Sequence, residues 1–177
     1  KARVEHAEHA FSGIKATSLN VPLAKSFKKK TNALKEVVDL YTKVVQTGEV
    51  TVVSFSTFRL GEVFEHFKSA LLNAERPKEL NAEQMEEYLF QLEEKAYPFE
   101  EKAVKAYESN VRRVQQSAGP YDEWVKRSYD RLALLRPSLY RREERTERVV
   151  SHLDSLLFSR LTGFEGAEPK HMVRAKN

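Results

Sequence analysis

The stretch from Asn81 to Val114, NAEQMEEYLFQLEEKAYPFEEKAVKAYESNVRRV, decides the fold class of this chain. Its apolar residues recur every three or four positions, which is the period of an amphipathic helix. Asn81 and Gln84 have the spacing of a capping box, so we expect the helix to begin there. Pro98 lies inside the pattern and leaves two options, one bent helix or two helices that meet at Tyr97. The in-phase positions are Met85, Tyr88, Leu89, Leu92, Ala96, Phe99, Ala103, Tyr107, Val111 and Val114.

The composition agrees with long helices. Among 177 residues there are only 6 Gly and 6 Pro, the two residues that most often interrupt regular structure. The hydrophobic share is 41% and the charged share 32%, which is typical of a folded domain with a charged surface. No apolar run approaches the ~20 residues that span a bilayer, so we expect no transmembrane segment. The absence of Cys excludes a disulfide, a thiol nucleophile and a Cys-ligated zinc site.

Glycines and prolines divide the rest of the chain into further helices. The segment from Glu49 to Phe58 is β-branched and half alternating, but nothing else in the chain could pair with it as a strand, so we expect a helix there as well. Gly61 would lie inside that helix and predicts close contact with a neighbouring backbone. Asp122 has the position of an N-cap. The expected helices cover residues 4–16, 22–48, 50–76, 81–118 (whole or divided), 122–137 and 141–163, and we expect residues 165–177 to be a polar tail or linker.

A weak internal repeat relates two pairs of these helices. The run from Lys35 to Tyr41, followed by Gly48, parallels the run from Lys102 to Tyr107, followed by Gly119, with the two tyrosines 66 residues apart. Each unit reads as a helix, a glycine turn and a second helix that ends at a proline. Such a hairpin cannot bury its apolar face alone and must stack on a neighbour.

This pattern resembles the tetratricopeptide-repeat (TPR) class. Tyr129, Leu132 and Pro137 have the spacing of the end of such a unit, although these helices are longer than a ~34-residue unit permits. The stretch from Tyr88 to Tyr107 and the following Trp-containing helix are similar to segments of divergent TPR-like proteins of the bacterial cell envelope, including those of gliding and predatory species. The resemblance implies an all-α α-solenoid of antiparallel hairpins with about six to seven helices over residues 1–164. It also implies a location in the periplasm or at the outer membrane, with the cytoplasm as the alternative. Because the first residue is Lys rather than Met, we also expect an excised piece of a larger protein, and the resemblance implies that this protein is bacterial.

Signatures of catalysis are missing from the sequence. It has no phosphate-binding glycine loop, no nucleophile elbow and no His-Glu-x-x-His pair. His6 and His9 are three residues apart, but no third metal ligand is evident. We therefore predict a protein that is not an enzyme and that has no cofactor and no metal.

Charge blocks indicate where a partner could bind. The net charge is +5 for residues 1–48, −4 for 76–108 and +5 for 109–142, within a total of +4. Such blocks could steer a complementary protein, although each basic group could also be a solvated helix face. The predicted partner-binding residues are Lys25, Lys28, Lys29 and Lys30 in one group and Trp124, Arg127, Arg131, Arg136, Tyr140 and Arg141 in the other.

The sequence thus predicts a non-catalytic protein–protein interaction or scaffold module. Its partner would be another protein or peptide. The alternative is a basic helical surface that binds nucleic acid or anionic membrane, with an affinity that falls steeply as salt rises. A purely structural spacer within a longer repeat protein is a third option.

Overall fold

The computed structural model describes residues 2–117 and 121–141, which are all-helical with connecting turns and contain no strand. They belong to one compact unit that runs to Arg141. The all-α prediction is confirmed for this part of the chain. The helix expected over 141–163 and the tail expected over 165–177 fall outside the described residues, apart from Arg141. The six described helices are α1 (Ala2–Ala16), α2 (Leu23–Val45), α3 (Val50–Leu72), α4 (Ala82–Ser117), α5 (Glu123–Leu135) and α6 (Pro137–Tyr140).

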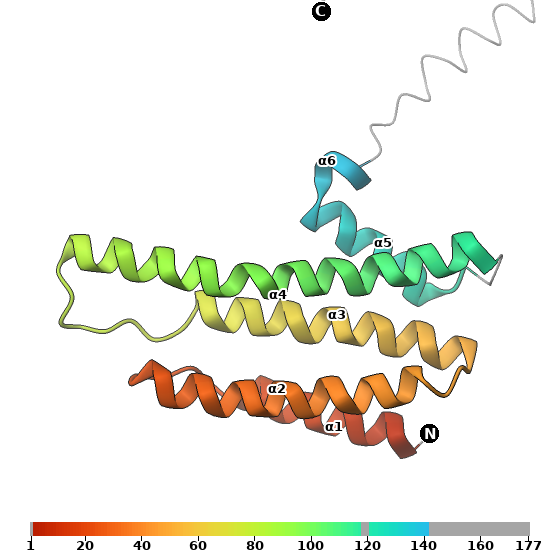
Figure 1. Ribbon diagram of the computed structural model, residues 1–177, viewed down its shortest axis with the longest axis horizontal. Helices are drawn as coiled ribbons and strands as arrows, with labels where there is room; N and C mark the ends of the chain where they lie inside the picture. The colour runs from red at the N-terminus through yellow and green to blue at the C-terminus, as the bar shows by residue number, and fades with distance from the viewer. Residues whose placement is uncertain (1, 118–120, 142–177) are drawn as a thin grey trace, which may run out of the picture. The chain divides into compact units, whose positions relative to one another are not determined.

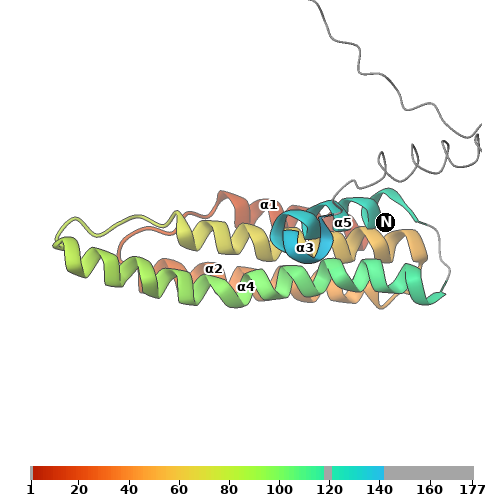
Figure 2. The same ribbon diagram turned by 90° about the horizontal axis from the view of Figure 1, so that it is seen from above.

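The first five helices alternate between two layers. Successive helices from α1 to α4 run antiparallel and pack on one another (Figure 1). In the view from above, α1, α3 and α5 lie on one side and α2 and α4 on the other (Figure 2). Within the first layer α3 packs against both α1 and α5, whereas α2 and α4 are each packed on α3 and their backbones do not come close to each other. Thus α3 is the central helix, and one of its faces lies between α2 and α4.

Local signals in the sequence set several helix ends. The capping box is confirmed, because the Gln84 backbone N–H donates to Asn81 Oδ1 at 2.9 Å and the Asn81 N–H donates to Gln84 Oε1 at 3.0 Å. Asp122 caps α5 by accepting from the Val125 N–H at 2.9 Å. Gly48 follows α2 in a turn with φ of +76°, a conformation that a side chain would disfavour. These starts and stops are local, which is why spacing alone could predict them.

For Pro98 the structure decides between the two options that the sequence leaves open, and for Pro137 it differs from the expectation. Pro98 lies within a single helix, α4, so the two-helix option is wrong. It is exposed, and the carbonyl that loses its partner at this turn can bond water. Pro137 was expected to close the helix that begins at Asp122, but that helix ends at Leu135 and Pro137 is the first residue of α6. Proline suits this position because the first helical N–H has no partner in the helix.

The apolar core is built around α3. One buried cluster joins α1, α2 and α3 and reaches α4 at Ala96, and a second joins α3, α4 and α5 around Tyr107 and Leu132. A chain of aromatic rings crosses the first cluster, in which Phe67 of α3 packs against Phe27 of α2 and Phe99 of α4. Such burial of apolar surface supplies most of the stability of a helix pair.

Buried polar groups tie α4 to both of its neighbours. Asn110, which is fully buried, donates to the Ser54 backbone carbonyl of α3 at 2.9 Å and to the Ser128 hydroxyl of α5 at 3.0 Å. Since an unpaired buried amide is costly, these bonds favour one relative position of the three helices.

Gly61 is in close contact with a neighbouring element, as the sequence predicts, but the neighbour is a side chain rather than a backbone. A Cβ atom at Gly61 would lie 2.3 Å from Cε1 and 2.4 Å from Cζ of the Tyr107 ring. The ring is fully buried, so α3 and α4 can approach this closely only because residue 61 lacks a side chain.

Candidate functional site

A buried tyrosine links the first three helices. Tyr41 of α2 donates its hydroxyl to the Glu8 carboxylate of α1. The same carboxylate accepts from Arg59 of α3 at 2.6 Å, and Arg59 also pairs with Glu62 at 2.6 Å. Burial and the hydrogen bond to Glu8 raise the pKa of Tyr41, so its hydroxyl remains a donor.

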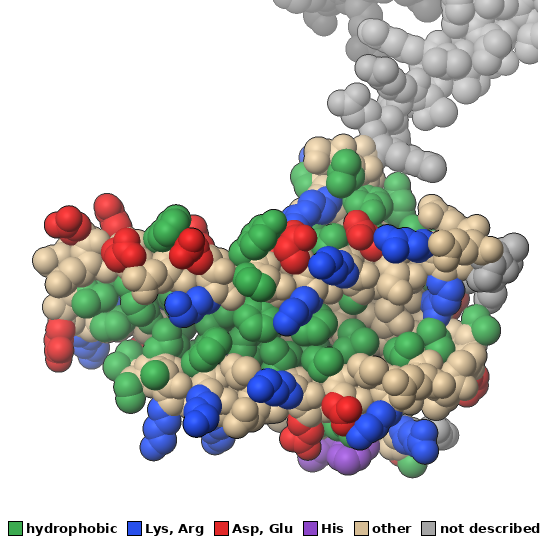
Figure 3. Space-filling model, in the orientation of Figure 1, with side chains coloured by type: hydrophobic (Ala, Val, Ile, Leu, Met, Phe, Trp, Pro, Cys, Tyr) green, Lys and Arg blue, Asp and Glu red, His purple; other side chains and the backbone are tan. Residues whose placement is uncertain are grey.

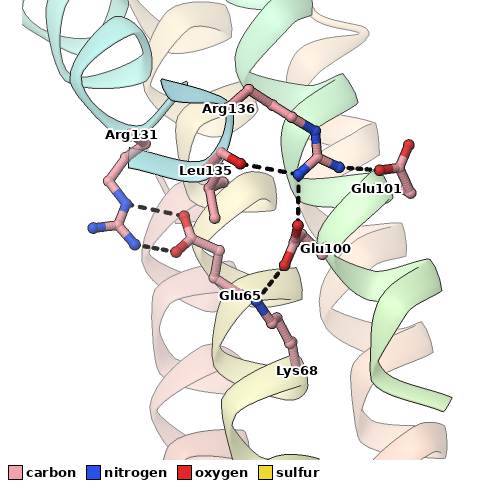
Figure 4. Close-up of polar contacts among 7 residues, drawn as sticks. All are labelled: Glu65, Lys68, Glu100, Glu101, Arg131, Leu135 and Arg136. Atoms are coloured by element: carbon pink, nitrogen blue, oxygen red, sulfur yellow. Dashed lines mark hydrogen bonds and ion pairs between the residues drawn. The ribbon is translucent and has the colours of Figure 1, made fainter. Parts of the chain in front are cut away.

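The same three residue types link α3, α4 and α5. Tyr107 of α4 donates to Glu65 of α3 at 2.6 Å. Arg131 of α5 holds this carboxylate with two N–H groups, one of them Nε at 3.0 Å (Figure 4). The hydrogen bond to Glu65 raises the pKa of Arg131, and burial raises that of Tyr107. We call each such set a Tyr–Glu–Arg contact.

The two contacts follow the repeat seen in the sequence. Tyr41 and Tyr107 are the tyrosines that the repeat aligns. In both cases the tyrosine lies on the first helix of its repeat unit and donates to a glutamate of the preceding helix, and an arginine of the unit's second helix pairs with that glutamate. The sequence repeat therefore has a physical counterpart, which connects each repeat unit to the helix that precedes it.

The predicted arginine group is largely occupied by ion pairs of this kind. Arg136 pairs with Glu100 at 2.6 Å and with Glu101, and Glu100 also accepts from Lys68 (Figure 4). Although burial opposes the effect, the bonds from Lys68 and Arg136 lower the pKa of Glu100. Much of the positive charge that the sequence assigns to a partner is therefore neutralised within the fold.

Arg127 and the predicted aromatic residues also have neighbours inside the molecule. Arg127 pairs with Glu123 at 2.7 Å and lies over the Trp124 ring. That ring is half-buried, with centroids 4.9 Å from Phe55 and 5.5 Å from Phe58 of α3. It therefore contributes to packing between α3 and α5.

The end of the described chain holds the last two predicted residues. The Tyr140 hydroxyl donates to Glu108 of α4 at 3.0 Å, and its ring packs edge-on against Tyr129. Arg141 is exposed at the end of α6. Within the described residues, the Arg141 side chain has no ion pair, hydrogen bond or ring contact, unlike the other predicted residues from Trp124 to Tyr140.

The predicted lysine group is divided by the structure. Three of its members, Lys25, Lys28 and Lys29, are exposed. Lys30 is only 1% exposed, so it is not part of a basic surface, although it follows two exposed lysines in the sequence. Its ammonium donates to the Ile14 carbonyl at 2.8 Å and to the Thr17 carbonyl, at the C-terminal end of α1. A cation is favourable there because these carbonyls carry the negative end of the helix dipole.

A pocket of about 300 Å³ lies on the layer formed by α1, α3 and α5. Burial, with help from the nearby Lys30 and Lys15, lowers the pKa of the His66 ring in its wall. Both of its carboxylates, Glu62 and Glu65, already belong to the ion pairs described above. The residues that line it are Phe11, Lys15, Glu62, Glu65, His66 and Arg131.

The opposite layer presents an apolar surface between α2 and α4, which we call the furrow. The space-filling view shows a continuous band of hydrophobic side chains there, between the two helices (Figure 3). Phe64 of α3 forms part of its floor, because Lys102 of α4 lies over both the Phe64 and the Phe99 rings, at 5.8 and 5.4 Å from their centroids. From their positions on the three helices, we place five partly buried apolar residues of the first core cluster at the furrow, namely Phe27, Val38, Leu60, Phe64 and Phe99.

Lysines follow both edges of the furrow. On α4, Lys95 lies seven residues before Lys102 and so belongs to the same row of the helix. On α2, Lys28 and Lys35 lie on the edge opposite to the one that faces α1. All four are exposed, and none has a salt-bridge partner among residues 2–117 and 121–141. We call these pairs the lysine rows.

Three of these four lysines, all but Lys28, are not among the partner-binding residues predicted from the sequence. One pattern in the sequence could have indicated two of them. Lys95 and Lys102 border the apolar pattern of α4 at a spacing of seven, which places them on one side of the buried stripe. The furrow itself could not be predicted, since it depends on α2 and α4 sharing a layer.

Other classes of site are not supported by the described residues. No group of three or more His, Cys, Asp or Glu side chains that could hold a metal occurs within them. None of the described helices combines the length and the hydropathy needed to cross a bilayer. Comparison with known proteins finds no match to a family model, a curated protein or a solved structure.

Proposed function

We propose that this chain is a non-catalytic module for protein–protein interaction, built as a TPR-like α-solenoid of hairpins within a larger bacterial scaffold protein. The alternating layers and the two Tyr–Glu–Arg contacts support this proposal, because they repeat one hairpin-to-helix connection along the chain. Location in the periplasm or at the outer membrane stays a prediction from resemblance.

The single observation that carries the proposal is the furrow. Contiguous exposed apolar surface on a folded protein marks an interaction site more often than chance, especially where a polar rim surrounds it. Here the rim consists of the lysine rows, which are exposed and have no salt-bridge partner among the described residues. A helix laid along an apolar groove with complementary charges is a common mode of protein recognition.

Binding of nucleic acid or anionic membrane is the weaker candidate. Arg127, Arg131 and Arg136 are engaged by carboxylates of this chain, and Lys30 is buried. The basic surface is therefore smaller than the sequence suggests.

A peptide-display selection on the immobilised 177-residue chain tests the proposed function. We expect enriched peptides to bind in solution, and Lys102→Glu to weaken them at least tenfold because it reverses a charge beside the furrow. Lys126→Glu on α5 is the matched control, since Lys126 is also exposed but lies on another helix. Failure to enrich any peptide above an unrelated helical protein, together with a chain that does not self-associate, would refute the proposal.

A further inference from the structure

The outer face of α4 carries two exposed aromatic residues that the core does not use. Phe90 is 56% exposed and Tyr97 is 60% exposed. They are seven residues apart, so they lie on the same side of the helix about 10.5 Å from each other. Both fall outside the apolar pattern that packs α4 on α3. Large exposed rings at this spacing indicate a surface that a partner covers.

Glutamates flank the two rings on both sides. Helical spacing places one pair on each side of the line from Phe90 to Tyr97. All four are exposed and none has a salt-bridge partner among the described residues. We call this surface the acidic ridge; its glutamates are Glu86 and Glu93 on one side and Glu87 and Glu94 on the other.

The ridge is accessible because of where α4 begins. The first turns of α4 project beyond the end of α3 (Figure 1), and acidic and apolar side chains alternate along this edge of the molecule (Figure 3). The ridge faces away from the furrow, since Lys95 and Lys102 occupy a different side of the same helix. One molecule can therefore offer both surfaces at the same time.

The acidic ridge and the furrow complement each other. The ridge has apolar rings between two rows of glutamates, and the furrow has an apolar floor between two rows of lysines. Each row of glutamates or lysines repeats after seven residues, or about 10.5 Å, so the charges have a common spacing. We propose that the acidic ridge of one copy docks in the furrow of a second copy, which names the partner in the interaction function proposed above and rests on it.

The two surfaces are different patches of one chain, and this determines the kind of assembly. A contact between unlike patches is heterologous, so each added copy leaves one ridge and one furrow free. Copies then associate head to tail into chains or rings rather than into a dimer closed by a two-fold axis. Because exposed ion pairs contribute, association should weaken as salt rises.

Sedimentation velocity over two decades of protein concentration, at low and at high salt, tests the proposal. The furrow variant is Lys95→Glu/Lys102→Glu, and the ridge variant is Phe90→Ser/Tyr97→Ser. All four residues are exposed, so we expect both variants to keep the helical circular dichroism of the wild type. We expect the wild type to form species larger than dimers, and each variant alone to be monomeric.

An equimolar mixture of the two variants gives the sharpest result. The furrow variant keeps its ridge and the ridge variant keeps its furrow, so the mixture should form a heterodimer that does not grow further. Lys126→Glu and Glu36→Lys, on exposed positions of α5 and α2, are the controls and should associate like the wild type.

Three results would overturn the proposal. They are a wild type that is monomeric throughout, a dimer that neither variant weakens, and a mixture that stays monomeric. If the wild type is monomeric but selected peptides bind it, the head-to-tail proposal fails and the interaction function stands. If it is monomeric and no peptide binds, both fail.

Discussion

Replacing Gly61 by alanine should destabilise this protein, although alanine is the better helix former. The intrinsic helix preference would favour the substitution by about 1 kcal/mol. Against it, the new Cβ would lie 2.3 Å from a carbon of Tyr107, where carbon atoms normally approach to about 3.5–4.0 Å. The ring is fully buried and its hydroxyl is bonded to Glu65, so relief of more than about 1 Å requires α3 and α4 to separate.

Overpacking of this severity costs about 3 kcal/mol, which leaves a net loss of about 2 kcal/mol. For a chain of this length that loss lowers Tm by roughly 4–8 °C. Urea unfolding and a thermal scan followed by circular dichroism would measure both quantities. Gly13→Ala in α1 is the matched control, because nothing lies within 4 Å of its Cβ position, and it should raise stability by up to about 1 kcal/mol.

A double-mutant cycle identifies the ring as the cause. Tyr107→Val removes the three ring carbons that the alanine would meet. In that background Gly61→Ala should be neutral or stabilising, giving a coupling energy of about 2–3 kcal/mol between the two sites. An alanine variant as stable as the wild type, or one equally destabilised with and without the ring, would refute the reasoning.

Three further predictions can be checked by urea unfolding. Arg131→Met should lower the free energy of unfolding by about 1–2 kcal/mol because the half-buried Glu65 carboxylate loses its arginine. Arg127→Met, in the exposed pair with Glu123, should cost less than about 0.5 kcal/mol. Equal costs would contradict the ion-pair assignment. Asn110→Leu should cost about 2 kcal/mol, since it removes the bonds that Asn110 donates to buried partners on α3 and α5. A neutral result would show that the network is dispensable. Burial and Lys30 lower the pKa of His66, so the unfolded chain binds a proton at this ring more readily than the folded chain does, and stability is lost as pH falls through about 6.5 and below. His66→Gln should flatten that part of the curve of stability against pH. An unchanged curve would assign the pH dependence to other groups.

The helices were predictable from sequence because their signals are local. The Asn81–Gln84 box and the Asp122 cap use residues three positions apart, and their bonds are the ones that the spacing predicts. Whether Pro98 breaks α4 could not be decided in the same way. Proline is tolerated in a helix when the freed carbonyl can reach water, and this depends on which side of the helix is packed.

Lys30 shows how a local pattern was misread. It follows Lys28 and Lys29 and so looks like part of an exposed basic run, but it also belongs to the seven-residue series Leu23, Lys30, Val37 and Val44, which borders α1 and α3. The periodicity therefore contained a signal for burial. What the sequence could not supply was the partner, since the carbonyls that bind its ammonium lie at the end of another helix.

The arginines were misassigned for a similar reason. Arg131 and its partner Glu65 are 66 residues apart, and no local rule joins them. A basic cluster in sequence is a basic surface only if the fold does not supply carboxylates to it. Conversely, Phe90 and Tyr97 could have been recognised, because they lie outside the apolar pattern of their own helix.

The charged groups of the two layers thus differ in their internal bonding, and this difference is the physical basis for proposing the furrow as the binding face. On the α1, α3 and α5 side, Glu8 and Glu65 are each held by a tyrosine and an arginine, so a ligand there would have to replace bonds that also hold the hairpins together. On the α2 and α4 side, the lysine rows form no such bonds within the described fold. A partner that meets their charges disrupts no internal ion pair and covers apolar surface as it binds, so binding at the furrow costs the fold less than binding at the opposite layer.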